Sequence, residues 1–200
     1  MFKTLKNKIQ TKINETDNLN DCLKYICDLL KNNLNGYDWV GFYFHVKKKN
    51  YLELLVFSGI PTEHTKIPFG KGICGQTAIS NSSYLTGDVS KEENYIACNI
   101  NVKSEIVVPI LNRDNINIGQ IDIDSNNLNQ FSNHDLRFLE SIRGISALVV
   151  LLFHLKDTTN SLLIHNFLIL NGKIFVDFFF VLSGFVIAHS YSSKIYTFID

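Results

Sequence analysis

Two cysteines and three carboxylates are the residues of this chain best suited to chemistry. Cys74 lies in the glycine-rich run PFGKGICG, and Cys98 lies in the run NYIACNINVKSEIV, which also contains Glu105. The run IGQIDIDS follows, and the period-two alternation of a strand places its Asp122 and Asp124 on one face. A thiol and three carboxylates gathered in one small domain indicate thiol redox chemistry on a small cationic or zwitterionic molecule.

The same residues have simpler interpretations, which the pattern alone leaves open. Cys74 in a glycine loop is also compatible with a packing role, because free cysteine is often buried. Asp122 and Asp124 alone would fit a solvated strand end followed by a turn at residues 125–127. No metal site is predicted, because His64 has no second histidine at ligand spacing.

Composition restricts the class of protein. The 200 residues carry 19 basic and 19 acidic side chains, so the net charge of zero gives no electrostatic footprint for nucleic acid. Residues 1–14 lack the apolar stretch of an export signal, so the four cysteines indicate a reducing, cytoplasmic location. Cys22 and Cys27 lie in a helical pattern and are expected to be buried packing residues.

Hydrophobic periodicity predicts an α+β fold with a central antiparallel sheet flanked by helices. A helix is expected over residues 16–34, with Thr16 or Asp17 as its N-cap. The other expected elements are a hairpin of strands 39–46 and 51–58, a short helix over 76–80, a short strand over 84–89, paired strands over 105–111 and 116–122, and a helix starting near 131–134 with Phe138, Leu139 and Ile142 on one face.

Several runs occur together in a family-specific order and spacing: WVGFYF, PFGKGICG, YIACN, SEIVVP and GQIDIDS. The chain resembles the free methionine-(R)-sulfoxide reductases, which are GAF-domain enzymes, from about Leu19 to Leu139. The resemblance implies a GAF domain over residues 1–140. It also implies thiol-dependent reduction of free L-methionine (R)-S-oxide to L-methionine, with no cofactor.

The resemblance implies a role for each matched residue. Cys98 would attack the sulfoxide sulfur, release methionine and become a sulfenic acid. Glu105, Asp122 and Asp124 would bind the substrate and help to protonate the sulfoxide oxygen. Trp39 and Tyr43 match the aromatic wall of the family's pocket, although strand residues four apart on one face could equally be core.

One position departs from the family pattern. The family usually has a further cysteine ten residues before that of the GICG run, where this chain has His64. Cys74 would therefore be the resolving thiol that forms a disulfide with Cys98, or an external thiol would resolve the sulfenic acid. By resemblance, thioredoxin is the expected electron donor, and a homodimer is a further expectation.

Residues 141–200 form a second, hydrophobic region. The runs RFLESIRGISALVVLLFHL and VDFFFVLSGF resemble the start of the acyltransferase-3 membrane family, in which Arg143 and His154 would belong to the acyl-transfer motif. Each apolar run is short or marginal for a membrane span of ~20 residues. Two interpretations remain: a two-helix membrane anchor within residues 144–191, or a truncated gene fusion.

The sequence therefore favours a reductase of free methionine sulfoxide. The alternatives are a non-catalytic GAF module that binds a small ligand, or a fragment of a membrane acyltransferase.

Overall fold

The computed structural model describes residues 1–16, 18–46, 49–95, 100–112 and 116–142. The chain divides into two compact units, Met1–Phe153 and His154–Asp200, and all described residues belong to the first. The predicted membrane-type region of 141–200, with Arg143 and His154, thus lies almost wholly outside the described residues. None of the described helices is both long and apolar enough to cross a bilayer.

Six strands among the described residues form a single antiparallel sheet with the order β3-β2-β1-β6-β5-β4. The hairpin β1/β2 and the pair β5/β6 confirm the strands expected from the sequence. The short strand β3 was not predicted, and β4 ends at Thr86 because the chain turns there into a 3-10 helix, η1. The bounds are β1 Trp39–His45, β2 Tyr51–Ser58, β3 Lys66–Pro68, β4 Tyr84–Thr86, η1 Val89–Lys91, β5 Ser104–Leu111 and β6 Asn117–Ser125.

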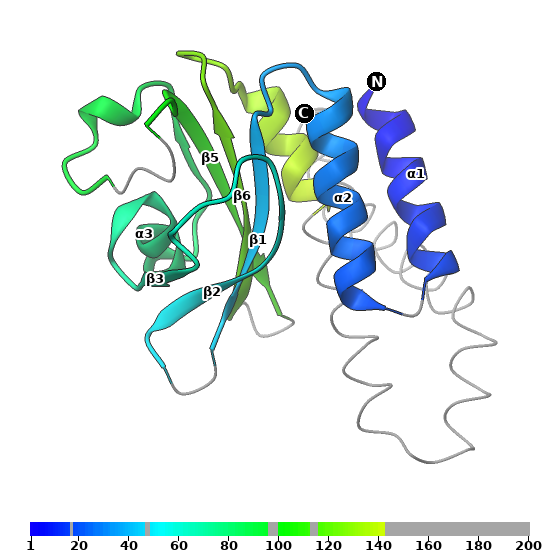
Figure 1. Ribbon diagram of the computed structural model, residues 1–200, viewed down its shortest axis with the longest axis horizontal. Helices are drawn as coiled ribbons and strands as arrows, with labels where there is room; N and C mark the ends of the chain where they lie inside the picture. The colour runs from blue at the N-terminus through cyan, green and yellow to red at the C-terminus, as the bar shows by residue number, and fades with distance from the viewer. Residues whose placement is uncertain (17, 47–48, 96–99, 113–115, 143–200) are drawn as a thin grey trace, which may run out of the picture. The chain divides into compact units, whose positions relative to one another are not determined.

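Helices α1 (Phe2–Glu15) and α2 (Leu19–Asn33) pack on one face of this sheet, together with a helix over residues 133–142. Figure 1 shows the three helices on the same side of β1 and β6. Cys22 and Cys27 are fully buried in this layer, as expected. The predicted face of the third helix is also buried in it: Phe138, Leu139 and Ile142.

The N-cap predicted for α2 was wrong. Asn18, in an extended conformation, accepts hydrogen bonds from the backbone N–H groups of Asn20 and Asp21. Its side-chain oxygen thereby satisfies donors that the first helical turn leaves without partners. Helix α1 was not predicted at all, although Leu5 and Ile9 bury the apolar stripe that joins it to α2.

Helix α3 (Gly72–Ser80) lies on the opposite face of the sheet and begins four residues earlier than predicted. Glycines discourage helix in isolation, but here they permit close packing. A Cβ atom on Gly75 would lie 2.5 Å from the Pro68 carbonyl oxygen, so only glycine lets the first turn approach β3 this closely. Cys74 consequently belongs to the first turn of a helix instead of a loop.

Candidate active site

The pairing of β5 with β6 brings three carboxyl groups together. Glu105 is directly opposite Asp124, and Asp122 is opposite Val107, so all three acids face the α3 side of the sheet. The exposed fraction is 3% for Glu105, 1% for Asp124 and 0% for Asp122. The solvated strand end considered for Asp122 and Asp124 is therefore wrong, and the predicted acidic cluster is confirmed.

Strand β1 adds two aromatic residues to the same face. Trp39 is opposite Asp124, and Tyr43 is opposite Gln120. Between them Gly41 is opposite Asp122, and a Cβ atom there would overlap the Trp39 ring. The indole therefore lies across Gly41 beside the acids, as expected for an aromatic wall. Both aromatic residues also belong to a buried apolar cluster, so the core interpretation describes their packing equally well.

Tyr43 is also connected to the position at which the family pattern is broken. Its hydroxyl donates a hydrogen bond of 3.0 Å to the backbone carbonyl of His64. His64 is half-buried and lies in the loop between β2 and β3. The loop that would carry the additional family cysteine therefore borders the aromatic wall.

Helix α3 places Cys74 against the acids. The Cys74 sulfur and one carboxylate oxygen each of Glu105 and Asp122 all lie within 4.8 Å of one another. Only 4% of Cys74 is exposed. Cys74 lies in the first turn of α3, and its predicted role as the resolving thiol stays a prediction. The apolar cluster that surrounds it also satisfies the packing interpretation.

Burial raises the pKa of every carboxyl group in the cluster, and the charges of neighbouring acids raise the pKa of Glu105 and Asp124 further. Burial is the largest cause for Glu105, followed by the charges of Asp122 and Asp124, and its pKa lies well above the usual value. Burial and then the charges of Asp122 and Asp38 likewise raise the pKa of Asp124. Burial raises the pKa of Asp122 to about 7, against hydrogen bonding with Cys74 and Glu105, which lowers it. Neutral carboxyl groups are consequently available to donate protons.

Further buried polar atoms lie on the same side of the sheet without a hydrogen-bond partner among the described residues. They are the Thr77 hydroxyl, both amide atoms of Gln120, the Trp39 ring nitrogen and both oxygens of Asp124. Thr77 is three positions after Cys74 in α3, and Gln120 precedes Asp122 by two in β6. Because buried polar groups are nearly always paired, this set indicates a site built to receive a polar ligand.

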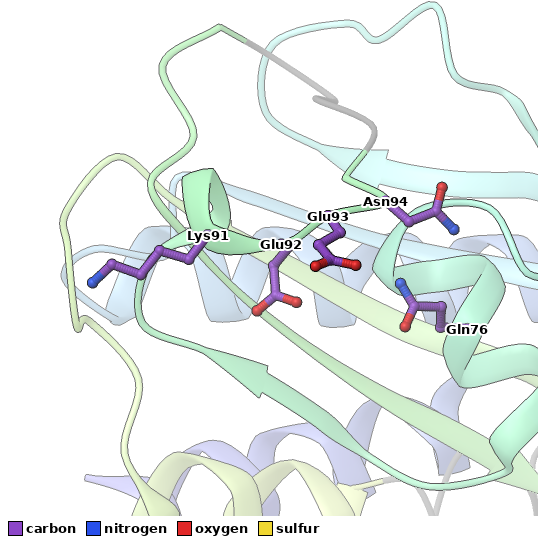
Figure 2. A pocket seen from close by; sticks show the side chains of 5 residues that line it. All are labelled: Gln76, Lys91, Glu92, Glu93 and Asn94. Carbon is purple, nitrogen blue, oxygen red and sulfur yellow. The ribbon is translucent and has the colours of Figure 1, made fainter.

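A cleft of about 610 Å³ opens beside α3, and Figure 2 shows the five side chains that line it. Glu92 receives a 2.6 Å hydrogen bond from the Tyr84 hydroxyl, and Asn94 donates one of 2.6 Å to the Gly70 carbonyl. The Glu92 charge also contributes to the raised pKa of Glu105, so this cleft is close to the buried acids. These residues were not predicted from the sequence, in which the acidic pair Glu92-Glu93 was the available signal.

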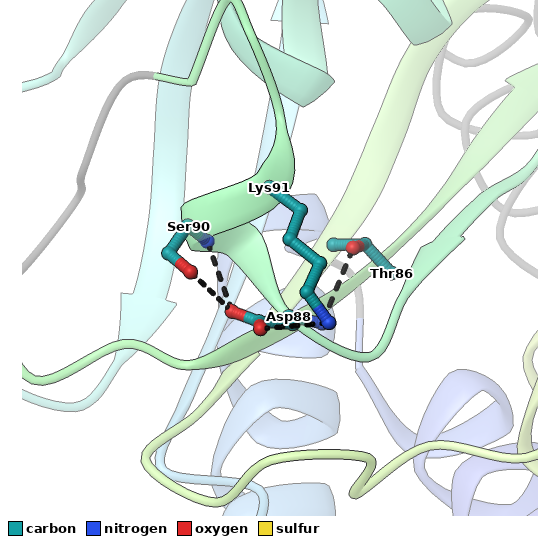
Figure 3. Close-up of polar contacts among 4 residues, drawn as sticks. All are labelled: Thr86, Asp88, Ser90 and Lys91. Carbon is teal, nitrogen blue, oxygen red and sulfur yellow. Dashed lines mark hydrogen bonds and ion pairs between the residues drawn. The ribbon is translucent and has the colours of Figure 1, made fainter.

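The basic residue at this cleft is directed away from the acids. In Figure 2, Lys91 points away from the other four side chains. Its ammonium group forms a 3.3 Å ion pair with Asp88, whose other oxygen accepts hydrogen bonds from the backbone and hydroxyl of Ser90 (Figure 3). The cleft thus keeps an acidic character near Glu92.

Three predicted site residues lie outside the described residues. Cys98, the predicted nucleophile, falls in the segment 96–99, and Arg143 and His154 fall in 143–200. Their predicted roles stay predictions. The structure does bring together the other predicted site residues: Cys74, Glu105, Asp122, Asp124, Trp39 and Tyr43.

Comparison with known proteins identifies the family. The GAF domain family matches residues 16–150. A free methionine-R-sulfoxide reductase of Saccharomyces cerevisiae is 36% identical over 132 residues, which are 66% of this chain and 73% of the yeast protein. The chain belongs to the GAF-domain family of free methionine-R-sulfoxide reductases. The reductase of Escherichia coli is 33% identical over 57% of this chain and 67% of its own length.

Solved structures of free methionine-R-sulfoxide reductases share this fold. The enzyme from Neisseria meningitidis, solved in complex with its substrate, has a TM-score of 0.70 at 32% identity and covers 74% of this chain and 87% of its own. The Staphylococcus aureus enzyme in complex with substrate has a TM-score of 0.67 at 35% identity, with coverages of 74% and 94%. The predicted GAF fold is confirmed for the described part of the chain.

Proposed function

We propose that this protein reduces free L-methionine (R)-S-oxide to L-methionine by thiol chemistry. Membership of the reductase family carries the proposal, because relatives at 32–36% identity bear that activity in their names. The arrangement of thiol, acids and aromatic wall gives the proposal a physical basis.

The site is suited to a free amino acid whose side chain ends in a sulfoxide. An ammonium group would be stabilised by the buried carboxylates of the cluster, because the charges of the described residues that act on Glu105 and Asp124 are all negative. The apolar part of the substrate would contact Trp39 and Tyr43. A protonated Glu105 or Asp122 would donate its proton to the sulfoxide oxygen as the S–O bond weakens.

The redox step transfers the sulfoxide oxygen from substrate to enzyme. The Cys98 thiol attacks the sulfoxide sulfur, and the products are a Cys98 sulfenic acid and the thioether of methionine. The substrate sulfur is reduced by two electrons, and Cys98 is oxidised by two. One thiol and one sulfoxide therefore give one sulfenic acid and one thioether, without any other reactant.

The cycle is completed by a second thiol. Cys74 attacks the sulfenic acid, forms the Cys74–Cys98 disulfide and releases water. A dithiol donor of the thioredoxin class then reduces the disulfide. Since His64 stands where the family usually has another cysteine, Cys74 is the thiol through which recycling would proceed.

Substitution of the two cysteines tests this scheme. Cys98→Ser should abolish loss of the R sulfoxide, measured by chromatography of released methionine. Cys74→Ser should release about one methionine per chain in a single turnover but recycle with thioredoxin at least tenfold more slowly. The S sulfoxide serves as the matched control substrate. An unchanged rate in Cys98→Ser would overturn the mechanism, and absence of any turnover with retained ligand binding would favour a non-catalytic GAF module.

Residues 144–191 are proposed to contact a membrane as a two-helix anchor, on the basis of their apolar sequence. Extraction of membranes with alkaline carbonate tests this: an integral anchor keeps the full chain in the pellet. Release of all the protein into the supernatant would contradict the anchor and favour the truncated fusion.

A further inference from the structure

Cys74, Glu105 and Asp122 together have the composition of a metal site. They come from α3, β5 and β6, and their sulfur and oxygen atoms converge to within 4.8 Å of one another. All three side chains are at least nine-tenths buried, so water competes poorly for them. A thiolate with two carboxylates is a donor set that zinc accepts.

Two observations besides the acidic cluster point to a bound polar species. The Thr77 hydroxyl and the Gln120 amide are fully buried on the same side of the sheet, with no hydrogen-bond partner among the described residues. Thr77 lies within one helical turn of Cys74 in α3, and Gln120 lies two strand positions before Asp122 in β6. They could donate to or accept from water molecules on an ion.

The negative charges around the cluster favour the binding of a cation. Among the described residues, the charges that act on Glu105 come from Asp122, Asp124 and Glu92, and those that act on Asp124 come from Asp122 and Asp38. Buried carboxylates without a cation must take up protons, whereas a divalent ion would neutralise two of them at once.

We propose that the reduced protein binds one zinc ion through the Cys74 thiolate and the carboxylates of Glu105 and Asp122, with water as the fourth ligand. Zinc–sulfur and zinc–oxygen bonds of normal length place such ligand atoms about 3.6 Å apart. The three atoms, which lie within 4.8 Å of one another, therefore need to approach by at most about an ångström. On binding, the Cys74 thiol loses its proton to solvent.

Zinc binding has a consequence for the reductase, and this part rests on the proposed function. The ion and the ammonium group of methionine sulfoxide would use the same carboxylates, so zinc should inhibit competitively. It would also occupy the sulfur that resolves the sulfenic acid. Zinc would thus hold the reduced enzyme inactive until a chelator or a high substrate concentration removes it.

Metal binding can be measured without turnover, on the full chain reduced and freed of small thiols. Zinc is titrated in competition with a chromophoric chelator, and cobalt(II) is used as a spectroscopic substitute. We expect one zinc per chain and a thiolate-to-cobalt charge-transfer band. Cys74→Ser and Glu105→Gln should each weaken zinc binding by at least about tenfold, and Cys74→Ser should also lose the cobalt band.

A matched control removes a thiol on the other side of the sheet. Cys27→Ala, in the helical layer, should bind zinc as the parent does. Equal zinc affinity in the parent and Cys74→Ser, with both folded by circular dichroism, would overturn the proposal, as would a cobalt complex of the parent without the charge-transfer band. A chain that binds zinc as described but has no reductase activity would support the metal site and count against the proposed function alone.

Discussion

At the scale of single residues, the unusual feature is a set of carboxyl groups that the fold shields from water. Glu105, Asp122 and Asp124 bind protons more tightly in the folded chain than in the unfolded one, since burial raises the pKa of each. Such a cluster destabilises the protein when its carboxyl groups are ionised without a bound cation, and the proposed ammonium group of the substrate would offset that cost. At these positions, the charges that would bind a cationic substrate therefore lower the free energy of unfolding.

This effect predicts a pH dependence of stability. The folded chain holds more protons than the unfolded chain from about pH 4 upward, and for Asp122 until its folded pKa of about 7. The free energy of unfolding should therefore fall with rising pH across that window, by up to about 1.4 kcal/mol per pH unit for each proton. Urea denaturation with a chelator present, at several pH values, measures it.

Glu105→Gln is the variant that tests the cause. It removes one buried charge, so it should flatten the pH dependence and raise stability relative to the parent above about pH 7. Glu63 is exposed, so Glu63→Gln is the matched control and should change neither the pH dependence of stability nor the free energy of unfolding. Stability that rises with pH in the parent would contradict the assignment.

Gly41 gives a second prediction at this scale. Gly41→Ala places a Cβ atom in the Trp39 ring, so the indole must leave its position beside Asp122. We expect KM for the sulfoxide to rise about tenfold, with a loss of stability of about 1–3 kcal/mol. Val40→Ala, whose side chain packs on the helical layer, is the control that loses stability without raising KM. Equal KM values in the two variants would show that the indole does not line the site.

At the scale of elements, the strands that show local alternation of apolar and polar residues could be predicted from the sequence. Elements that form only through tertiary contacts could not. The β1/β2 and β5/β6 pairs follow from period-two runs separated by polar turns. The early start of α3 does not, because GKGICG has low helix propensity and becomes helical only where Gly75 packs on Pro68. Helix α1 had a readable signal, since Phe2, Leu5 and Ile9 recur at helical spacing among lysines.

The α2 N-cap can be located by substitution. Asn18→Ala should lower the free energy of unfolding by about 1 kcal/mol, because two backbone N–H groups lose their acceptor. Thr16→Ala, at a position predicted from the sequence, removes only the acceptor of a 3.4 Å hydrogen bond from the Asn18 backbone N–H and should lower the free energy of unfolding by less. Thermal or urea denaturation compares them, and the reverse order would restore the original prediction.

The cleft between α3 and the segment after η1 leads to a prediction about substrate capture. Glu92→Gln removes a negative charge near the buried acids, so KM for the sulfoxide should rise about two- to fivefold at low salt while kcat is kept. Tyr84→Phe removes the 2.6 Å hydrogen bond that holds Glu92 and should have a smaller effect in the same direction. An effect that persists unchanged at high salt would argue against an electrostatic role.

At the scale of the whole molecule, the sheet separates two functions. One face carries α1, α2, the helix over residues 133–142 and the larger apolar cluster, whereas the other carries α3, a smaller apolar cluster and the described candidate site residues. The residue types and their order were sufficient to predict which side chains gather there. The closeness of Cys74 to Glu105 could not be predicted from the sequence, because it depends on how α3 packs on the sheet.

The division of the chain into two units predicts that the second unit, His154–Asp200, is dispensable for the chemistry. The family match ends at residue 150, close to the division after Phe153. A chain truncated after Phe153 should keep kcat/KM within about twofold of the full chain. A loss beyond about tenfold, with the truncated chain folded, would assign the second unit a part in the reaction.

The indole that crosses Gly41 has a practical consequence. Trp39 is the single tryptophan of the chain. With excitation at the red edge of its absorption, emission comes from that one ring. An arriving amino acid or ion should change its intensity or colour, so the protein carries a built-in optical reporter of occupancy that needs neither label nor turnover.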